Sequence, residues 1–470
     1  MDPRLRALNR FGLGARVGER QQIADPRAWL RAQTEAGPPL LEAPAGASPE
    51  AIGEAVRGLR IIVQGDQRDR QQARRRLAEI GAAEARAALT ARAASDRPFV
   101  ERLVAFWSNH LCVSIGGKIL VAPLAGTYER EVIRPHVLGR FEDMVLASAR
   151  HPAMLAYLDN FQSIGPSSQG AQLGRGRGAR RGLNENYARE LLELHTLGVD
   201  GGYTQQDVQE LARLLTGWTI EGQGGADRRP AQAARGRGRA GAQARPPAAN
   251  GPIRFLFRPA LHEPGRKTVL GERYGDGVEE GVRAIRALCR HPSTATFMAR
   301  KLVIHFVSDD PPAAAVDRVA RAFRSSDGDL RVVAHALVEL PEAWDDAGGK
   351  FRTPQDWLIA VLRAFGTRDV RPNVANLLRQ LRQPLWSPPS PKGYGDTTSE
   401  WADPDSLLNR GELARSIARV IGRPRLDPRV LLEVVDVEDG NPLPGLLADG
   451  SIAVEERVAL ALAGPAFQWR

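Results

Sequence analysis

The stretch Asn184-Glu-Asn-Tyr-Ala-Arg-Glu-Leu-Leu-Glu-Leu-His-Thr-Leu-Gly198 carries the pattern that decides the fold of this chain. Polar residues Asn186, Glu190 and Glu193 recur at i, i+4 and i+7, while leucines occupy the opposite side. This spacing is typical of an amphipathic helix, which packs its apolar side against a core. Thr204 follows closely and is placed to cap a second helix that runs to Leu215.

The same helical signals recur in both directions along the chain. Residues 49–94 are rich in Ala, Arg, Glu and Leu without an internal proline, which predicts one or two long helices after Ser48-Pro49. Pro98 and Pro292 each stand where a helix is expected to begin. Further helices are expected at Pro26–Ala36, Tyr128–Val137, Phe141–Ala149, Pro152–Leu158, Val278–Cys289, Ala313–Phe323, Leu330–Leu340 and Pro354–Phe365, and from Asp405 and Val454. The sequence therefore predicts a mainly α protein.

Strand signals are sparse and are concentrated in one region. Ile253–Phe257 alternates, Pro264-Gly265 is turn chemistry, and Lys267–Gly271 follows, so we expect a small β-hairpin. Residues 383–404 are rich in proline and glycine but hold Trp386, Tyr394 and Trp401, which predicts a long ordered loop on the core. We therefore expect residues 1–470 to form one large multi-helix globular domain with a hairpin and a Pro/Gly/aromatic loop.

Composition restricts the class of protein. The chain has 470 residues, of which 43% are hydrophobic and 26% charged, as in a globular protein with a core. No apolar run approaches the roughly 18–20 residues of a membrane span, and no secretory signal is recognisable, so we expect a cytoplasmic location. Only Cys112 and Cys289 occur, which excludes a disulfide framework and a cysteine zinc finger.

The formal net charge of +10 is concentrated in two segments. Residues 171–181 carry +4 and residues 222–250 carry +5, so the rest of the chain is nearly neutral. We expect 165–182 (basic, Gly-rich) and 222–250 (Arg/Gly/Ala-rich) to be disordered insertions, because they lack apolar residues to bury. They resemble Arg/Gly segments that bind RNA loosely but lack interleaved aromatic residues, so a solvated linker is preferred to a nucleic-acid partner.

The helix that begins near Asn184 holds the strongest candidate for chemistry. Two carboxylates and an amide on one face suit a divalent metal or an acid/base pair if histidines approach them. His110 ends an apolar helix and His262 stands at the mouth of the predicted hairpin. The enzyme hypothesis is therefore a polar pocket whose candidate catalytic and metal-ligating residues are His110, Asn186, Arg189, Glu190, Glu193 and His262. Of these, His110, Glu190, Glu193 and His262 are the candidate ligands of a divalent metal, and Arg189 would orient the carboxylates.

Structural explanations of the same residues remain open. Glu190, Glu193 and Arg189 also fit ion pairs that fix neighbouring helices, and His110 also fits a hydrogen-bonded core histidine. His195 faces the leucine side of its helix, which favours packing. Two explanations also remain for the aromatic residues Trp386, Tyr394 and Trp401 and for Arg410 on the following helix. They form either a stacking surface for a sugar or peptide or a flap that its aromatic residues anchor in the core. No Gly-x-Ser-x-Gly, His-Glu-x-x-His or P-loop motif is present.

Several motifs together identify a family resemblance. Besides Asn184–Gly198 and its continuation to Trp218, these are Leu8–Gly12, Phe106–His110, Ala153–Asn160, His262–Gly271, Gln383–Trp401 and Phe467–Arg470. The chain resembles the bacterial family known as domain of unknown function 1800 over essentially its whole length. The resemblance implies a bacterial source, an all-helical fold and a gene neighbour encoding an exported sulfatase-like protein. The alternative function is therefore a non-catalytic partner or assembly factor for such a protein, with a periplasmic or envelope location. The chain departs from the family in its long basic insertions and in Glu263, where aspartate is common.

Overall fold

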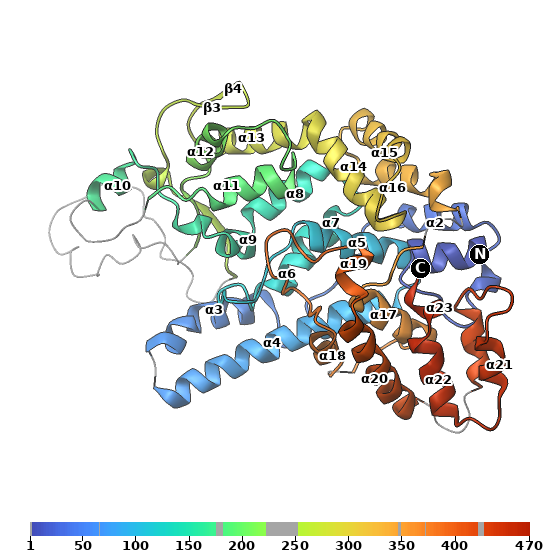
Figure 1. Cartoon of the computed structure of the whole chain (residues 1–470). Helices are drawn as coiled ribbons and strands as arrows, with labels where there is room; N and C mark the ends of the chain where they lie inside the picture. The colour runs from blue at the N-terminus through green and yellow to red at the C-terminus, as the bar shows by residue number, and fades with distance from the viewer. Residues whose placement is uncertain are drawn as a thin grey trace.

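The computed structural model describes residues 2–64, 66–174, 182–221, 252–345, 349–371, 373–421 and 427–470. Helices dominate this part of the chain, which confirms the mainly α prediction (Figure 1). The α-helices are α1 (Pro3–Arg6), α2 (Pro26–Glu35), α3 (Pro49–Gln64), α4 (Gln67–Ala94), α5 (Pro98–His110), α6 (Ala125–Tyr128), α7 (Arg134–His136), α8 (Phe141–Arg150), α9 (Pro152–Tyr157), α10 (Gln169–Gly174), α11 (Asn186–Glu190), α12 (Gln205–Leu214), α13 (Val278–Arg290), α14 (Pro292–Phe306), α15 (Ala313–Ser325), α16 (Leu330–Val338), α17 (Pro354–Ala364), α18 (Val374–Gln380), α19 (Thr398–Trp401), α20 (Pro404–Ile421), α21 (Leu443–Ala448), α22 (Val454–Ala463) and α23 (Pro465–Gln468).

Three π-helical segments extend or join α-helices. They are η1 (Ala7–Phe11) after α1, η3 (Glu129–Ile133) between α6 and α7, and η5 (Leu191–His195) after α11. A π-turn holds more residues than an α-turn, so each segment rotates the side chains that follow it relative to α-helical expectation.

The helices that matter most for the site begin as the sequence predicts. Proline is the first residue of α5, α14 and α17, where its missing N–H costs no hydrogen bond. Thr353 caps α17 by accepting a hydrogen bond from the backbone N–H of Asp356 at 3.2 Å. The imidazole of His291 accepts from the N–H of Ser293 at 3.2 Å and caps α14.

The strand pairing differs from the predicted hairpin. β2 (Phe255–Phe257) pairs antiparallel with β1 (Trp218–Ile220), and β3 (Lys267–Val269) pairs with β4 (Glu272–Tyr274). The two segments expected to pair with each other are thus in separate two-stranded sheets. Leu270 (φ 50°) and Gly271 (φ 78°) form the tight turn after β3, so that strand folds back on the residues that follow it.

Part of the first predicted insertion, residues 165–174, lies within the described residues. Residues 165–174 include α10 and pack on the segment before β3, where Gly165 donates to the carbonyl of Leu261 at 2.9 Å. The N–H of Ser167 donates to the carboxylate of Glu263 at 2.8 Å. Residues 175–181 and the second predicted insertion, 222–250, lie outside the described residues.

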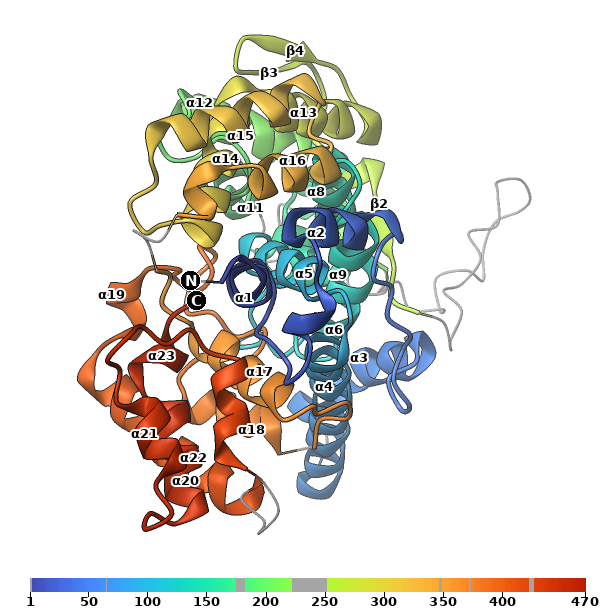
Figure 2. The ribbon, with the colours of Figure 1, turned by 90° about the vertical axis from the view of Figure 1, so that its right-hand side faces the viewer.

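Two clusters of buried apolar side chains meet in the middle of the molecule. The larger contains most of α5, α8, α9 and α13–α16, and the smaller contains α17, α20 and α22 together with Leu5, Leu8 and Leu13. Figure 2 shows α12–α16 at the top and α18 and α20–α22 in the lower part, with α1 and α5 between them. None of the helices in the described ranges combines the length and the apolar character that crossing a bilayer requires.

Candidate functional site

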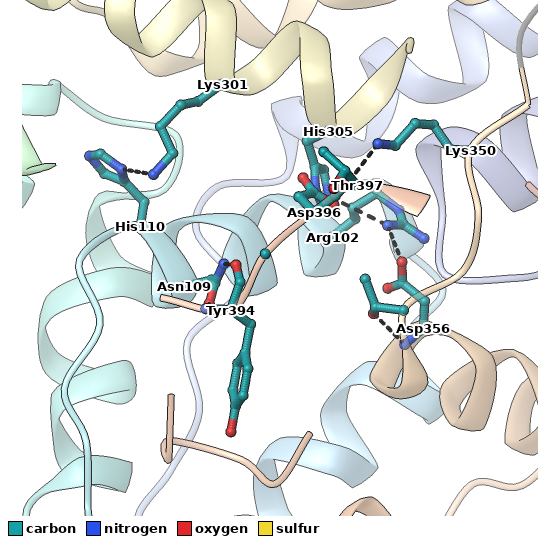
Figure 3. Close-up of polar contacts among 12 residues, drawn as sticks. Arg102, Asn109, His110, Lys301, His305, Lys350, Asp356, Tyr394, Asp396 and Thr397 are labelled. Atoms are coloured by element: carbon teal, nitrogen blue, oxygen red, sulfur yellow. Dashed lines mark hydrogen bonds and ion pairs between the residues drawn. The ribbon is translucent and has the colours of Figure 1, made fainter. Parts of the chain in front are cut away.

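A cavity of about 510 Å³ lies where the two apolar clusters meet. Its walls come from α5, α14, the start of α17 and residues 383–404, called here the aromatic loop. The apolar side chains of the wall include Phe106, Phe297, Ile304, Ile359, Leu385 and Trp386. Polar side chains stand at two ends of this space (Figure 3).

Helical spacing brings the polar residues to the cavity. Lys301 and His305 are one turn apart on α14, so their side chains project from the same face. Phe106 and His110 have the same spacing on α5. The two helices contact each other at these positions, because Lys301 meets His110 and the rings of His305 and Phe106 lie 5.3 Å apart.

At one end of the cavity a lysine contacts a histidine instead of a carboxylate. The Nζ of Lys301 lies 3.0 Å from Nδ1 of His110, and Nε2 of His110 lies 3.2 Å from the backbone oxygen of His195. The carbonyl can only accept, so Nε2 of His110 donates and Nδ1 is left to accept from the lysine. Lys301 forms no ion pair with any carboxylate of the described residues.

Burial controls the protonation of this group. It lowers the pKa of His110 well below the usual range and that of His195 to about 3, so both imidazoles are neutral at neutral pH. Burial also lowers the pKa of Lys301 to about 8, because the surrounding protein replaces the water that stabilises an ammonium ion. Lys301 is therefore mostly charged at neutral pH, with a minor fraction present as the free amine.

At the other end the charged groups are paired. His305 Nδ1 lies 2.6 Å from Asp396 of the aromatic loop, and Arg102 Nη1 lies 3.4 Å from His305 Nε2. Arg102 also donates to Asp356 at 3.1 Å, and Nε of Arg470 lies 3.3 Å from the same carboxylate. Burial raises the pKa of Asp356, but the charges of Arg102 and Arg470 outweigh it and hold the pKa below its ordinary value.

The aromatic loop is fastened to the end of α5. Asn109 donates to the backbone oxygen of Tyr394 and accepts from its N–H, both at 2.8 Å. The thiol of Cys112 donates to the oxygen of Pro391 at 3.3 Å, and Ser114 donates to that of Pro388 at 2.9 Å. Gly393 (φ 87°) approaches so closely that a Cβ there would lie 2.5 Å from the backbone oxygen of Asn109. The loop thus forms a fixed cover over the cavity.

Of the residues predicted from the sequence, His110 and Glu193 line the same cavity. Arg189 pairs with Glu193 at 3.3 Å and with Glu185 at 3.4 Å, as the structural explanation expects. Asn186 lies apart from the cavity lining and donates to the oxygen of Leu158 at 3.4 Å. Glu190 is half-buried, and burial followed by the charge of Glu193 raises its pKa.

His262 is not brought to His110 and Glu193. Its Nδ1 lies 2.9 Å from the oxygen of Thr216, and its Nε2 accepts from the N–H of Gly277 at 3.2 Å, so both nitrogens hold the β3–β4 region together. The described residues contain no group of three or more His, Cys, Asp or Glu side chains placed to hold a metal ion. The predicted set of His110, Glu190, Glu193 and His262 is therefore not assembled as one metal site.

Of the four residues predicted to form a ligand-binding loop, two line the cavity and two do not. Trp386 and Tyr394 line the cavity, and the indole of Trp386 donates to buried Glu129 at 3.1 Å. Trp401 is buried and donates to the oxygen of Gly395 at 3.0 Å. Arg410 is buried over the ring of Phe351, 4.7 Å from its centroid, and donates to the oxygen of Arg352. The last two residues support the loop and do not face the cavity.

Sequence reasoning missed Lys301, His305, Asp356 and Asp396. A signal existed for the first two, because lysine is rare in this chain, with five residues in all, and Lys301 stands in the apolar helix Phe297–Phe306 one turn before His305. Asp396 reaches the site from a loop, and no periodicity predicts where a loop side chain points.

The fold and the cavity define a mainly helical protein with a covered, partly apolar pocket that holds a lysine and several ion-paired groups. The chain belongs to the family described as "Protein of unknown function (DUF1800)", which matches residues 6–469. Neither the curated proteins nor the solved structures include a significant match to the chain.

Proposed function

We propose that the protein is enzyme-like and that its substrate is a small organic anion, bound in the cavity beneath the aromatic loop. The observation that carries this proposal is the position of Lys301, which lines the cavity beside a neutral imidazole and forms no ion pair with a carboxylate of the described residues. A partly buried charge without an ion-pair partner costs free energy, and an anionic ligand supplies that partner.

The carboxylates that line the cavity already have partners. Glu193 pairs with Arg189, Asp396 with His305 and Asp356 with Arg102. Glu400 accepts from the N–H of Thr397 at 3.1 Å. Each carboxylate of the lining thus has a hydrogen-bond or ion-pair partner, whereas Lys301 contacts a neutral imidazole.

Buried arginines behind Asp356 add to the positive potential. Arg352 and Arg410 are buried close enough to Asp356 to interact with its charge, as are the paired Arg102 and Arg470. Behind this end of the cavity, four guanidinium groups interact with Asp356, and some of them also with Asp396 and Asp403. Such an excess of one sign attracts ligands of the opposite sign.

The apolar side chains of the cavity wall indicate the chemical character of the part of the ligand that carries no charge. A volume of about 510 Å³ lies within the range of sites for small organic molecules, which are mostly apolar with a few placed polar groups. Phe106, Phe297 and Trp386 offer aromatic faces. An anion with an apolar or aromatic body fits this wall better than a bare inorganic ion.

The experiment compares matched probes by thermal unfolding. Phenylacetate and phenyl phosphate are expected to raise the Tm of the protein, and the neutral isostere phenylacetamide is not. Lys301→Met removes the charge and is expected to weaken binding of either anion about tenfold or more, since a charge-assisted hydrogen bond contributes about 1.5–3 kcal/mol.

Lys392→Met is the matched control. Lys392 also lines the cavity but is exposed, so its charge is screened by water and its loss is expected to change anion binding by less than about threefold. The proposal fails if neither anion stabilises the protein, or if both variants respond as the wild type does.

A further inference from the structure

We infer that Lys301 is a nucleophile that condenses with the carbonyl group of the bound anion, so the substrate class is an oxo acid. This inference rests on the proposed binding of an organic anion. The geometry that points to it is the position of Lys301, whose amine lies at the cavity wall and is hydrogen-bonded to the imidazole of His110. The imidazole nitrogen that faces the amine accepts this hydrogen bond and has no proton to donate.

The neighbours of Lys301 keep part of the amine uncharged and oriented. His110 Nδ1 accepts from it at 3.0 Å, and the ring of Phe297 lies 5.7 Å from its nitrogen. Neither neighbour supplies the negative charge that would hold the group permanently as an ammonium ion. A pKa lowered to about 8 leaves roughly one amine in ten free at neutral pH. Lysines that form Schiff bases are activated in this way.

The hydrogen bond between His110 and the carbonyl of His195 determines the direction of proton transfer. Because Nε2 of His110 donates at 3.2 Å to that carbonyl, its Nδ1 carries the lone pair that faces Lys301. His110 is buried and its ring stacks on Phe106, so its orientation is fixed. His110 is therefore placed as the proton carrier between the amine and the oxygen of the substrate.

The reaction balances without an oxidant or a metal. The amine nitrogen of Lys301 forms a bond to the carbonyl carbon, and Nδ1 of His110 takes the proton that the nitrogen loses. The carbonyl π bond breaks in the same step and leaves an alkoxide, to which His110 returns the proton, giving a hydroxyl. This hydroxyl takes a second proton from solvent, equivalent to the one that Lys301 released on becoming a free amine, and leaves as water when the carbon–oxygen bond breaks. The product is a protonated imine, which keeps a positive charge beside the carboxylate of the oxo acid.

The other basic groups of the cavity do not fit this role. The Nδ1 of His305 faces Asp396 and its Nε2 faces Arg102, so neither nitrogen is open to a ligand. Lys392 is exposed and has no imidazole beside it in the described residues. Lys350 is buried and contacts Asp309 and the backbone oxygen of Asp396.

The test traps the imine in the full-length protein. Phenylpyruvate is added with sodium cyanoborohydride, and intact mass followed by peptide mapping locates the reduced adduct among the five lysines. One adduct on Lys301 is expected, with labelling of Lys392 at least tenfold slower. Phenylacetate, which has the carboxylate but no ketone, is expected to slow the labelling by competition.

Lys301→Arg separates this inference from the proposed function. Arginine keeps the positive charge, so phenylacetate is expected still to raise the Tm, but it forms no imine, so the adduct is lost. His110→Phe is expected to slow trapping about tenfold or more, because the proton carrier is lost. Near-ultraviolet circular dichroism confirms that each variant is folded.

Two results overturn the inference. If phenylacetate stabilises the wild type but phenylpyruvate gives no adduct on Lys301, the nucleophile is refuted and anion binding stands. If labelling falls equally on all accessible lysines, Lys301 has no special reactivity and the inference is again refuted. If neither compound binds nor reacts, both the inference and the proposed function fail.

Discussion

At the scale of single residues, the partner of each charged side chain determines whether that side chain is available to bind a ligand. Asp356, Asp396 and Glu193 each contact a cationic or imidazole group, and Lys301 contacts an imidazole. Removing one member of a buried pair of charged side chains lowers the stability of the fold, whereas a charged side chain without an ion-pair partner is available to a ligand. The chemistry proposed for the cavity therefore depends on Lys301 more than on its better-partnered neighbours.

Anion binding is expected to depend on pH through Lys301. Its pKa of about 8 means that the ammonium ion is present below that pH and is lost as the pH rises through it. Because phenylacetate needs the charge and stays ionised throughout, its affinity is expected to fall about tenfold per pH unit above about pH 8. Titration calorimetry between about pH 6 and pH 10 checks this. Lys301→Arg, which stays charged, is expected to give a nearly flat profile.

Gly393→Ala tests the close approach of the aromatic loop to α5. A Cβ at this position would meet the backbone oxygen of Asn109 at 2.5 Å and would also need a left-handed backbone. We expect a loss of about 2–4 kcal/mol from strain and displacement together, measured by urea unfolding. Gly440→Ala is the control, since Gly440 has φ 83° but nothing within 4 Å, and about 1 kcal/mol is expected there. Equal losses in the two variants would contradict the close contact.

At the scale of elements, the π-helical segment η5 explains why the predicted row of polar residues separates. In a continuous α-helix Asn186, Glu190 and Glu193 would share one face. The wider turn of Leu191–His195 rotates Glu193 relative to α11. Glu193 consequently reaches the cavity, while Asn186 bonds to the backbone near α9. The same segment places the oxygen of His195 where it accepts from His110.

Besides its contacts with α5, the aromatic loop is held by a partly buried hydrogen bond between Asp396 and His305. Asp396 contacts His305, and its pKa is lowered because the charges of His305 and Lys350 outweigh the effect of burial. Asp396→Asn is expected to cost about 1.5–3 kcal/mol of local stability. Trypsin cleavage after exposed Lys392 is then expected to rise about tenfold or more, because cleavage follows the open population of the loop.

The control for this variant is Asp405→Asn at the exposed start of α20, which is expected to leave the cleavage rate within about twofold. An unchanged rate in Asp396→Asn would show that the pair does not hold the loop. Because the folded pKa of Asp396 lies below its ordinary value, the stability it contributes is complete above the ordinary pKa and is lost as the pH falls further towards the folded pKa.

For the whole molecule, the sequence predicts local structure far better than it predicts tertiary contacts. Helix starts such as Pro98 and Pro292 depend on neighbouring residues, and the structure confirms them. The pairing of β2 with β1 joins segments on either side of residues 222–250, which no local signal encodes. The cavity likewise gathers α5, α14, α17 and the aromatic loop, so His110 and Glu193 were predictable as polar residues but Asp396 was not.

The last prediction concerns the insertion between β1 and β2. The N–H of Glu221 donates to the oxygen of Arg254 at 2.9 Å, so the two ends of the segment are already adjacent. Replacing residues 222–251 with a four-residue Gly-Ser linker is therefore expected to preserve the fold. Loop closure costs about 0.6 kcal/mol per doubling of length, so a roughly eightfold shorter loop is expected to stabilise the protein by about 2 kcal/mol in urea unfolding.

The same variant decides whether the insertion binds nucleic acid. Its six arginines and one aspartate give residues 222–250 a charge of +5, so any RNA binding through this segment must weaken steeply with salt. Because the insertion lacks stacking aromatics, we expect wild type and variant to bind poly-uridylate equally weakly at physiological salt, with phenylacetate binding intact in both. Salt-sensitive binding that is present only in the wild type would assign an RNA-binding role to residues 222–250. Loss of the cooperative unfolding transition in the variant would instead show that the fold requires them.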